Sequence, residues 1–191
     1  MQLWGGGGSP LKPTSDGNCQ DRSGTKVEIM ADLRPILEEV KTDPKWKETK
    51  VAVASSCDEP SWARECIQLI QINSNIKLKN IFDPNLTEIY KSPKSVHLKE
   101  ISKKSGIDLK DMMFFDNEWG KFVYKWRLKQ YSVNKYVHVH HLIFWFLGNC
   151  QTVAKVGVSV VYTPKGVTRS LFEEAMTKFP FPGEIIGKRR R

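Results

Sequence analysis

The sequence predicts an α/β fold, a doubly wound parallel sheet with helices on both faces. Three observations support this prediction. Short β-branched runs alternate with helical patterns, each run is apolar almost throughout, and single helices separate successive runs. Strands joined by one helix pair in parallel through right-handed crossovers. In such a sheet, ligands bind beyond the carboxyl ends of the strands.

The first half of the chain carries the signals for two helices and one strand. Residues 32–41, DLRPILEEVK, have apolar side chains at helical spacing, and Pro35 is tolerated in the first turn. The run KVAVAS at 50–55 is nearly all apolar and predicts a strand covered on both faces. Residues 61–72 predict a second helix with one apolar side, for which Ser61 is the expected N-cap.

The second half of the chain continues this alternation. A polar-faced helix is expected over 95–106, where a final glycine suits a left-handed C-cap. The runs MMFFD at 112–116 and VGVSVVY at 156–162 predict two more buried strands. The last helix, expected over 170–179, begins with Ser170 three residues before a glutamate, which is the pattern of a capping box.

These elements place one α/β domain over 27–180. Residues 1–26 are rich in Gly, Ser, Pro, Asp and Asn and are expected to form a flexible N-terminal segment. Residues 181–191 are expected to be a basic tail, whose final KRRR is interpreted as a solvated end rather than a nuclear address. A stretch of unusual composition, 121–148, interrupts the domain.

Composition restricts the class of protein. The net charge is +9, but five positive charges and no acid lie in 121–148, so the remainder carries +4 and basicity identifies no partner. The four cysteines form no C-x-x-C pair, which fits reduced intracellular thiols. No signal-peptide pattern opens the sequence, and the longest apolar run is far shorter than the roughly 20 residues that span a bilayer. We expect a soluble monomer of the cytoplasm, or else of the nucleus, without a membrane partner.

Two of the predicted strands end in residues that suit a phosphate site. Ser55 and Ser56 offer hydroxyls and Lys94 offers an ammonium, the groups that bind phosphate oxygens. Asp116 and Asn117 offer the hard oxygens that Mg²⁺ prefers. Taken singly, a serine after a strand is often a turn residue or a cap, and a lysine before a helix is often solvated. Their order along an α/β sheet favours a site.

Three segments carry a resemblance to a known family: KVAVASSCDEPSWARE, EIYKSPKSVHLKEISKKSGIDLKDMMFFDNE and VGVSVVYTPKGVT. They resemble the magnesium-dependent, acid phosphatase-like enzymes of the haloacid dehalogenase (HAD-like) superfamily. The resemblance implies a HAD-like Rossmann-type fold and phosphoryl transfer through an aspartyl-phosphate with Mg²⁺. It also implies a small phosphorylated substrate, either a sugar phosphate or the phosphotyrosine of a protein tyrosine phosphatase.

The resemblance assigns roles position by position. Ser55 resembles the hydroxyl that binds phosphate, and Lys94 resembles the lysine that offsets charge on the nucleophile and the phosphoryl group. Asp116 and Asn117 correspond to the acid pair near Mg²⁺, with an amide replacing the second acid. Ser56, a further phosphate-binding candidate, stands where close relatives often have arginine.

The family's nucleophile motif, Asp-x-Asp-x-Thr, does not occur in this sequence. It is expected directly before Leu3, where only Met1 and Gln2 stand, so the first strand of the fold is missing with it. The hypothesis is that the sequence is a truncated copy that starts a few residues too late. The alternative is a catalytically inactive pseudophosphatase that binds phosphate, because a covalent intermediate needs the missing carboxylate.

The stretch 121–148 breaks the family pattern. Excising it joins FFDNEWG to NCQTVAKVGVSVVY, and the codons of its borders can contain splice-site sequences, so we favour a retained intron. Three alternative hypotheses give this stretch a function: a metal site on its histidines, a basic aromatic arm for single-stranded nucleic acid, and a membrane-surface helix. Nucleic acid binding is therefore an alternative function rather than the favoured one. The histidines are His138, His140 and His141.

Overall fold

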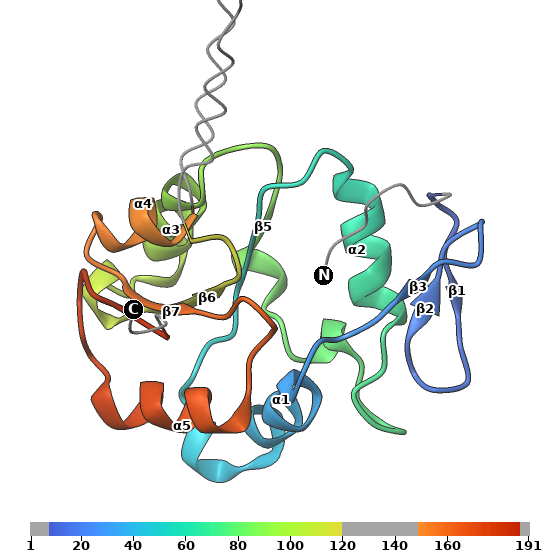
Figure 1. Ribbon diagram of the computed structural model, residues 1–191, viewed down its shortest axis with the longest axis horizontal. Coiled ribbons are helices and arrows are strands. Elements are labelled where there is room, and N and C mark those ends of the chain that lie inside the picture. The colour runs from blue at the N-terminus through green and yellow to red at the C-terminus, as the bar shows by residue number, and fades with distance from the viewer. Residues whose placement is uncertain (1–7, 120–148, 188–191) are drawn as a thin grey trace, which may run out of the picture.

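A computed structural model describes residues 8–119 and 149–187 (Figure 1). The expectations for 121–148, for residues 1–7 and for the terminal KRRR lie outside the described residues. The helices are α1 Leu33–Thr42, α2 Pro60–Leu69, α3 Lys94–Ser105, α4 Asn149–Ala154 and α5 Arg169–Lys178. The strands are β1 Lys12–Pro13, β2 Cys19–Gln20, β3 Lys26–Val27, β4 Val53–Ser55, β5 Thr87–Ile89, β6 Met113–Asp116, β7 Ser159–Tyr162 and β8 Ile185–Ile186. Short 3₁₀ turns lie at Pro44–Trp46, Leu78–Asn80, Pro84–Leu86 and Leu109–Asp111.

The parallel strands form two separate sheets. Strand β4 pairs with β5, with Ala54 opposite Glu88. Strand β6 pairs with β7, which pairs with β8 in turn, giving the order β6-β7-β8. The mixed α/β architecture with parallel sheets confirms the general prediction, whereas the expected single sheet is, in the described residues, divided between β4 and β6.

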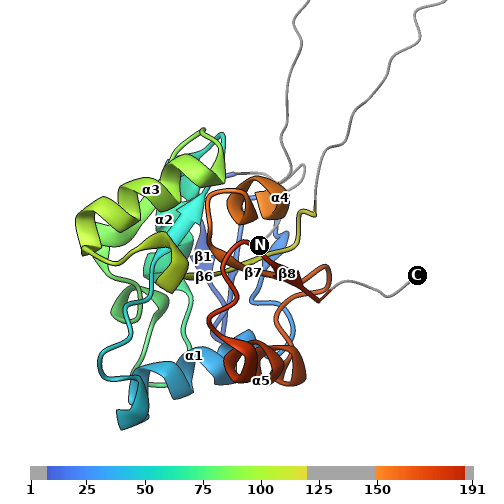
Figure 2. The ribbon, with the colours of Figure 1, turned by 90° about the vertical axis from the view of Figure 1, so that its left-hand side faces the viewer.

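Helices cover both faces of the sheets. Helices α3 and α4 lie on one face, and α1 and α5 lie on the other (Figure 2). One apolar cluster joins α3 and α4 to Phe114 of β6, and another joins α1 to α5 across Phe115. Successive residues of β6 thus point to opposite helix layers, which explains why the run MMFFD is apolar throughout.

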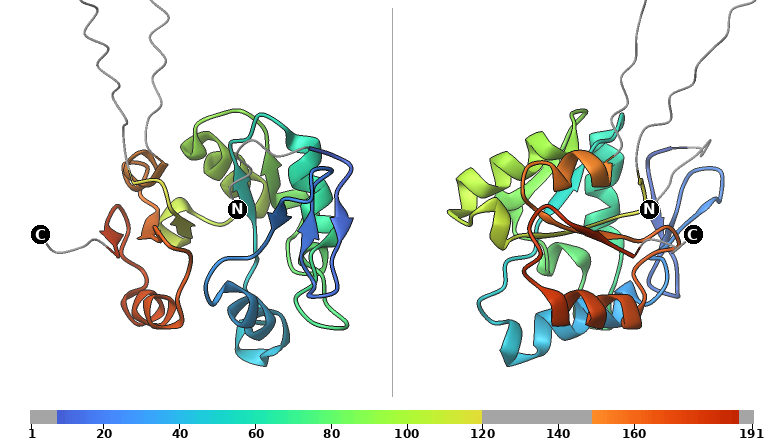
Figure 3. Two further views of the ribbon diagram at one scale, coloured as in Figure 1. Left: turned by 45° about the vertical axis from the view of Figure 1, so that its right-hand side comes forward. Right: turned by 60° about the vertical axis from the view of Figure 1, so that its left-hand side comes forward.

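The division of the sheet leaves a cavity of about 2160 Å³, which we call the central cavity. Residues 51–57, containing β4, and residues 111–119, containing β6, both line it. In the left-hand view of Figure 3, the orange and red part of the chain lies apart from the blue-to-green part. The two parts meet through helix contacts and through a single parallel bridge between Ala31 and Val167, and not through pairing of β4 with β6.

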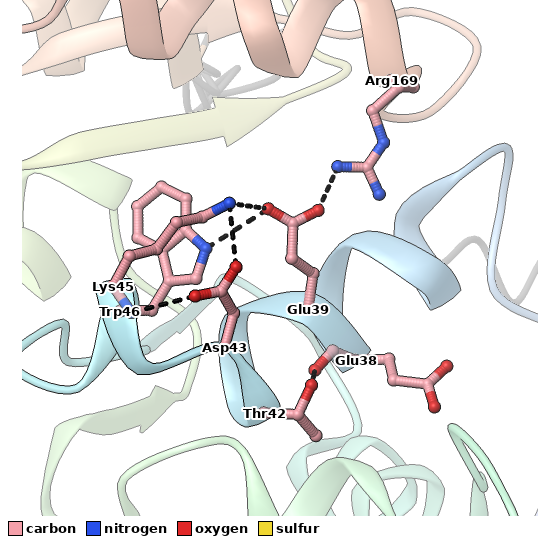
Figure 4. A network of polar contacts seen from close by, with 7 residues as sticks. All are labelled: Glu38, Glu39, Thr42, Asp43, Lys45, Trp46 and Arg169. Atoms are coloured by element: carbon pink, nitrogen blue, oxygen red, sulfur yellow. Dashed lines mark hydrogen bonds and ion pairs between the residues drawn. The ribbon is translucent and has the colours of Figure 1, made fainter.

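One contact between the two parts is a polar network that connects α1 to α5 (Figure 4). The Glu39 carboxylate accepts hydrogen bonds from Lys45 at 2.8 Å and from Arg169, while Trp46 packs on Phe172 with ring centroids 5.9 Å apart. Hydrogen bonds from Lys45 and then Arg169 hold the pKa of Glu39 at about 2, below the ordinary 4.5. The network therefore connects the two parts through an ion pair that needs an ionised carboxylate.

Several local expectations are corrected. Helix α2 begins at Pro60 with Glu59 at the N-cap position, so Ser61 is not the cap, because proline suits the first helical turn. Thr168, rather than Ser170, caps α5 by accepting a hydrogen bond from the Leu171 amide. The predicted left-handed end of α3 is confirmed, since its C-cap glycine has φ 74°.

The segment expected to be loop before residue 27 contains a small antiparallel sheet, β1-β2-β3. Cys19 of β2 and Val27 of β3 pack against Cys66 of α2 and against Ile70, which directly follows that helix. The two-residue strands are too short to show alternation in sequence, which explains why composition alone suggested a loop. All four cysteines are free thiols. In the described part of the chain, no helix is both long and apolar enough to cross a membrane.

We predict that Glu39→Gln weakens the connection between the two parts. At pH 7 the loss should be at most about 1 kcal/mol, a fall in Tm of about 2–4 °C, because the pair is partly exposed. A carboxylate with a lowered pKa stabilises the fold above its unfolded pKa and loses that effect as pH falls through its folded pKa. The difference between variant and parent should therefore fade between pH 4.5 and about 2.

Thermal unfolding followed by circular dichroism measures this difference. The matched control is Glu38→Gln, one residue earlier on α1, where the side chain accepts a hydrogen bond from Asn73 and forms no ion pair with another described residue. Equal Tm changes in the two variants at pH 7 would show that the Glu39 ion pair contributes nothing specific.

Candidate active site at the carboxyl ends of β4 and β6

Lys94 lies between the ends of the two sheets. It is the first residue of α3, is only 9% exposed, and its ammonium donates a hydrogen bond to the Ala54 carbonyl of β4. A cation at a helix N-terminus opposes the helix dipole, so packing rather than helix electrostatics places it there. Burial lowers the pKa of Lys94, and the nearby carboxylates of Asp116 and Glu118 oppose that shift.

Asp116 ends β6 on the opposite side of the central cavity. Its Oδ1 accepts a hydrogen bond from the Glu118 amide at 2.8 Å, a local turn that fixes the carboxylate. Burial raises the pKa of Asp116, while the Glu118 hydrogen bond and the charge of Lys94 lower it. The site therefore pairs a partly desolvated cation with a partly desolvated acid.

Ser55 and Ser56, at the carboxyl end of β4, form part of the wall of the central cavity. The Ser55 carbonyl accepts from the Tyr90 amide at 3.1 Å, which fixes its backbone against β5, and Ser56 is exposed. Both serines line the central cavity together with Lys94, Asp116 and Asn117. The structure thus brings all five predicted site residues to one cavity, although their roles in phosphate or metal binding stay predictions.

Asn149 belongs to this site and was missed from sequence. Its side-chain amide donates to Glu118 Oε2 at 2.7 Å, and the next amide, of Cys150, donates to the Glu118 carbonyl at 3.1 Å. The Cys150 thiol also donates to the Asp116 carbonyl at 3.7 Å. Residues before and after 121–148 are therefore hydrogen-bonded neighbours. In the sequence, the sign of this contact is the motif FFDNEWGNCQ, which forms when 121–148 is excised.

His97 has a structural role beside the site. It is fully buried on α3, its Nε2 lies 3.0 Å from the Tyr90 carbonyl, and its ring meets the edge of Tyr90. Burial lowers the pKa of His97, which favours the neutral ring. His97 therefore holds the end of β5 to α3 and does not face the central cavity.

Asp116 and Asn117 offer the type of ligand atom that Mg²⁺ prefers. Both offer oxygen ligands, and Mg²⁺ in proteins often uses one or two carboxylates together with waters and substrate phosphates. In residues 8–119 and 149–187, no group of three or more His, Cys, Asp and Glu side chains is placed to hold a metal ion. A metal here would therefore depend on few protein ligands.

Comparisons with known proteins agree with the general α/β fold. The family model described as Acid Phosphatase matches residues 3–133. A HAD-like hydrolase superfamily protein of Schizosaccharomyces pombe is 29% identical over 113 residues, which cover 58% of this chain and 63% of that protein. The fold and the comparisons define a HAD-like protein. More particularly, the chain belongs to the acid phosphatase family, which confirms the resemblance read from its motifs.

The extent of these matches adds two facts. The family match takes in the first part of 121–148 and ends before Asn149. The chain spans less than two thirds of the fission yeast relative. Neither fact tests whether 121–148 is a retained intron, which stays a hypothesis.

We predict that deleting residues 121–148 stabilises the fold. The flanking residues Glu118 and Asn149 already touch, so removal shortens a loop of about 30 residues to a few without moving its ends. Each doubling of loop length costs about 0.6 kcal/mol, so the free energy of unfolding should rise by about 2 kcal/mol. Urea denaturation measures it.

The control replaces 121–148 with a Gly/Ser segment of equal length, which keeps the loop length but removes its side chains. This control should match the parent. If the control and the deletion variant both lose stability, side chains of 121–148 contribute to the fold and the segment is not dispensable.

Proposed function

We propose that the chain is a magnesium-dependent phosphatase domain that acts on phosphomonoesters, of the phosphotyrosine or sugar phosphate type. One observation carries the proposal. The buried ammonium of Lys94 and the serines that end β4 share the central cavity with Asp116 and Asn117. Cations and hydroxyls suit phosphate oxygens, and the acid and amide suit the metal.

The residues divide this work by position. Lys94 and Ser55 would bind the phosphate oxygens at the end of β4, and Ser56 would add a hydroxyl from the rim. Asp116 and Asn117 would hold Mg²⁺ at the end of β6. When bound, the ion supplies positive charge that offsets the negative charge of the phosphoryl group. Partial burial strengthens these interactions because the local dielectric is lower than that of water.

The covalent step would need a carboxylate that these residues do not supply. The family resemblance implies an aspartyl-phosphate, and the 191-residue sequence contains no Asp-x-Asp-x-Thr. A polypeptide of these 191 residues alone is therefore expected to bind phosphate without turnover, which is the pseudophosphatase alternative, and the proposed hydrolysis requires such a motif in addition to the residues described. Restoring such a motif ahead of Leu3 should restore hydrolysis if the remaining groups are competent.

We predict that Lys94→Gln lowers the affinity for inorganic phosphate about 10- to 100-fold, because a hydrogen bond from a charged group contributes about 1.5–3 kcal/mol. Isothermal titration calorimetry with and without Mg²⁺ measures the affinity. Because burial lowers the pKa of Lys94, the affinity of the parent should begin to fall with rising pH earlier than for an exposed lysine.

The matched control is Lys99→Gln, an exposed lysine on the same helix. It should bind phosphate as the parent does. Equal losses in the two variants would show that net charge, and not the position of Lys94, determines binding. Phosphate binding that is unchanged in both would contradict the proposed site.

We predict that Asn117→Asp tightens Mg²⁺ binding about tenfold, because the second acid adds one negative charge beside Asp116 and about 1.4 kcal/mol of attraction in a partly solvated site. Titration calorimetry with Mg²⁺ gives the change. The control is Asn85→Asp, which adds the same charge at an exposed position outside the cavity lining. A gain of equal size in the control would place the effect in the overall charge of the protein.

A further inference from the structure

An exposed ion pair joins the loop after β4 to the loop after β5. The Lys91 ammonium lies 2.7 Å from Oδ1 of Asp58, and the two side chains are 66% and 77% exposed. Lys91 comes two residues after the end of β5, and Asp58 comes three residues after the end of β4. The pair therefore lies at the carboxyl ends of the strands, the edge of a parallel sheet where ligands bind.

The two partners differ in their relation to the central cavity. The lining of the cavity includes Lys91 but does not include Asp58. An ion pair between exposed side chains is weak, because water competes for both charges and screens their attraction. An anion inside the cavity can therefore replace Asp58 as the partner of Lys91 at little cost.

Lys91 is one of two cations at this end of the cavity. Among the described residues that line it, the cations are Lys50, Lys91 and Lys94. Lys50 precedes β4 and donates a hydrogen bond to the Ser105 carbonyl at 3.4 Å, so it belongs to the opposite end of that strand. Lys91 and Lys94 are three residues apart, so their α-carbons are separated by at most about 11 Å. Lys94 is the buried cation of this pair, and Lys91 is the exposed one.

The charges around Lys94 determine where a second anionic group can lie. The Lys94 ammonium lies near the carboxylates of Asp116 and Glu118, at the end of β6, and near the Cys57 thiol in the loop after β4. The two carboxylates repel a second anion on the β6 side of a phosphate that is bound to Lys94. The wall formed by the loops after β4 and β5 carries no such charge in the lining, and Lys91 lies on it.

We propose that Lys91 is a specificity-determining residue that binds a second anionic group of the substrate, and that the substrate is a small phosphomonoester carrying a carboxylate. The inference rests on the proposed function, in which Lys94 binds the phosphate. The carboxylate takes the place of Asp58 beside the Lys91 ammonium, and Asp58 is left in solvent. Of the two substrate types, this favours a phosphorylated sugar acid over phosphotyrosine.

The test compares two ligands that differ in one group. 3-Phosphoglycerate has a carboxylate where glycerol 3-phosphate has a hydroxymethyl group, and their phosphate ends are the same. Isothermal titration calorimetry of the 191-residue protein measures both affinities at fixed ionic strength, with and without Mg²⁺. The parent should bind 3-phosphoglycerate about fivefold more tightly, which is the upper range for an ion pair that stays partly solvated.

Substitutions of Lys91 test whether this cation causes the preference. Lys91→Gln should bind the two esters equally, whereas Lys91→Arg keeps the positive charge and should retain the preference. The matched control is Lys99→Gln, which removes the same charge from an exposed position outside the cavity lining. This control should prefer 3-phosphoglycerate as the parent does.

Asp58→Asn separates recognition from a merely structural role of the ion pair. If Lys91 binds the carboxylate of the ligand, removing its competitor should increase the preference for 3-phosphoglycerate about twofold to fivefold. If the pair only ties the two loops together, Asp58→Asn should change the preference in the same direction as Lys91→Gln. A preference that falls in both variants would therefore overturn the proposal.

The other outcomes distinguish this inference from the proposed function. Equal binding of the two esters by the parent would overturn the role of Lys91 and leave the phosphate site in place. A preference that survives Lys91→Gln would also overturn it, because another group, such as Mg²⁺, would then bind the carboxylate. An equal loss in Lys99→Gln would assign the preference to net charge. If neither ester nor inorganic phosphate binds, the proposed function fails and this inference fails with it.

Discussion

The division of the parallel sheet between β4 and β6, as the described residues show it, is the constraint on which the rest of the structure depends. A parallel sheet is stable when strand pairing satisfies its backbone groups and helices cover both faces. Here the helices are in place, but pairing stops on either side of the central cavity. The two parts are joined by apolar contacts between helix layers, by a parallel backbone bridge between Ala31 and Val167, and by the Glu39–Arg169 ion pair. These contacts keep the carboxyl ends of both sheets close together, which is what a site at those ends needs.

Lys94 connects this constraint to function. Burying an ammonium costs free energy unless opposite charge or hydrogen bonds compensate, and here one backbone carbonyl and two nearby carboxylates do so. Perturbed titratable groups of opposite sign at the ends of parallel strands are typical of sites where ligands bind.

Membership in the acid phosphatase family changes the interpretation of residues 121–148. Composition alone makes 121–148 the most conspicuous part of the sequence. The structure shows that Glu118 and Asn149 on its two sides are bonded to each other, beside Asp116. The described residues Glu118 and Asn149 therefore close this side of the site through their own contact. Whether a mature message keeps these codons is a question for the transcript, and whether the segment stabilises the fold is a question for the deletion variant.

The sequence by itself determined the features that depend on local periodicity and residue type. The apolar runs of β4, β6 and β7 and the helix α3 with its left-handed glycine end follow from neighbours in the chain, whereas the roles of the five candidate site residues stay predictions. The tertiary structure decided what depends on residues distant in sequence: Thr168 rather than Ser170 as the cap of α5, the contact of Asn149 with Glu118, and the separation of β4 from β6. Strand pairing is such a property, because an apolar run specifies that a strand is buried but not which neighbour its edge groups will find.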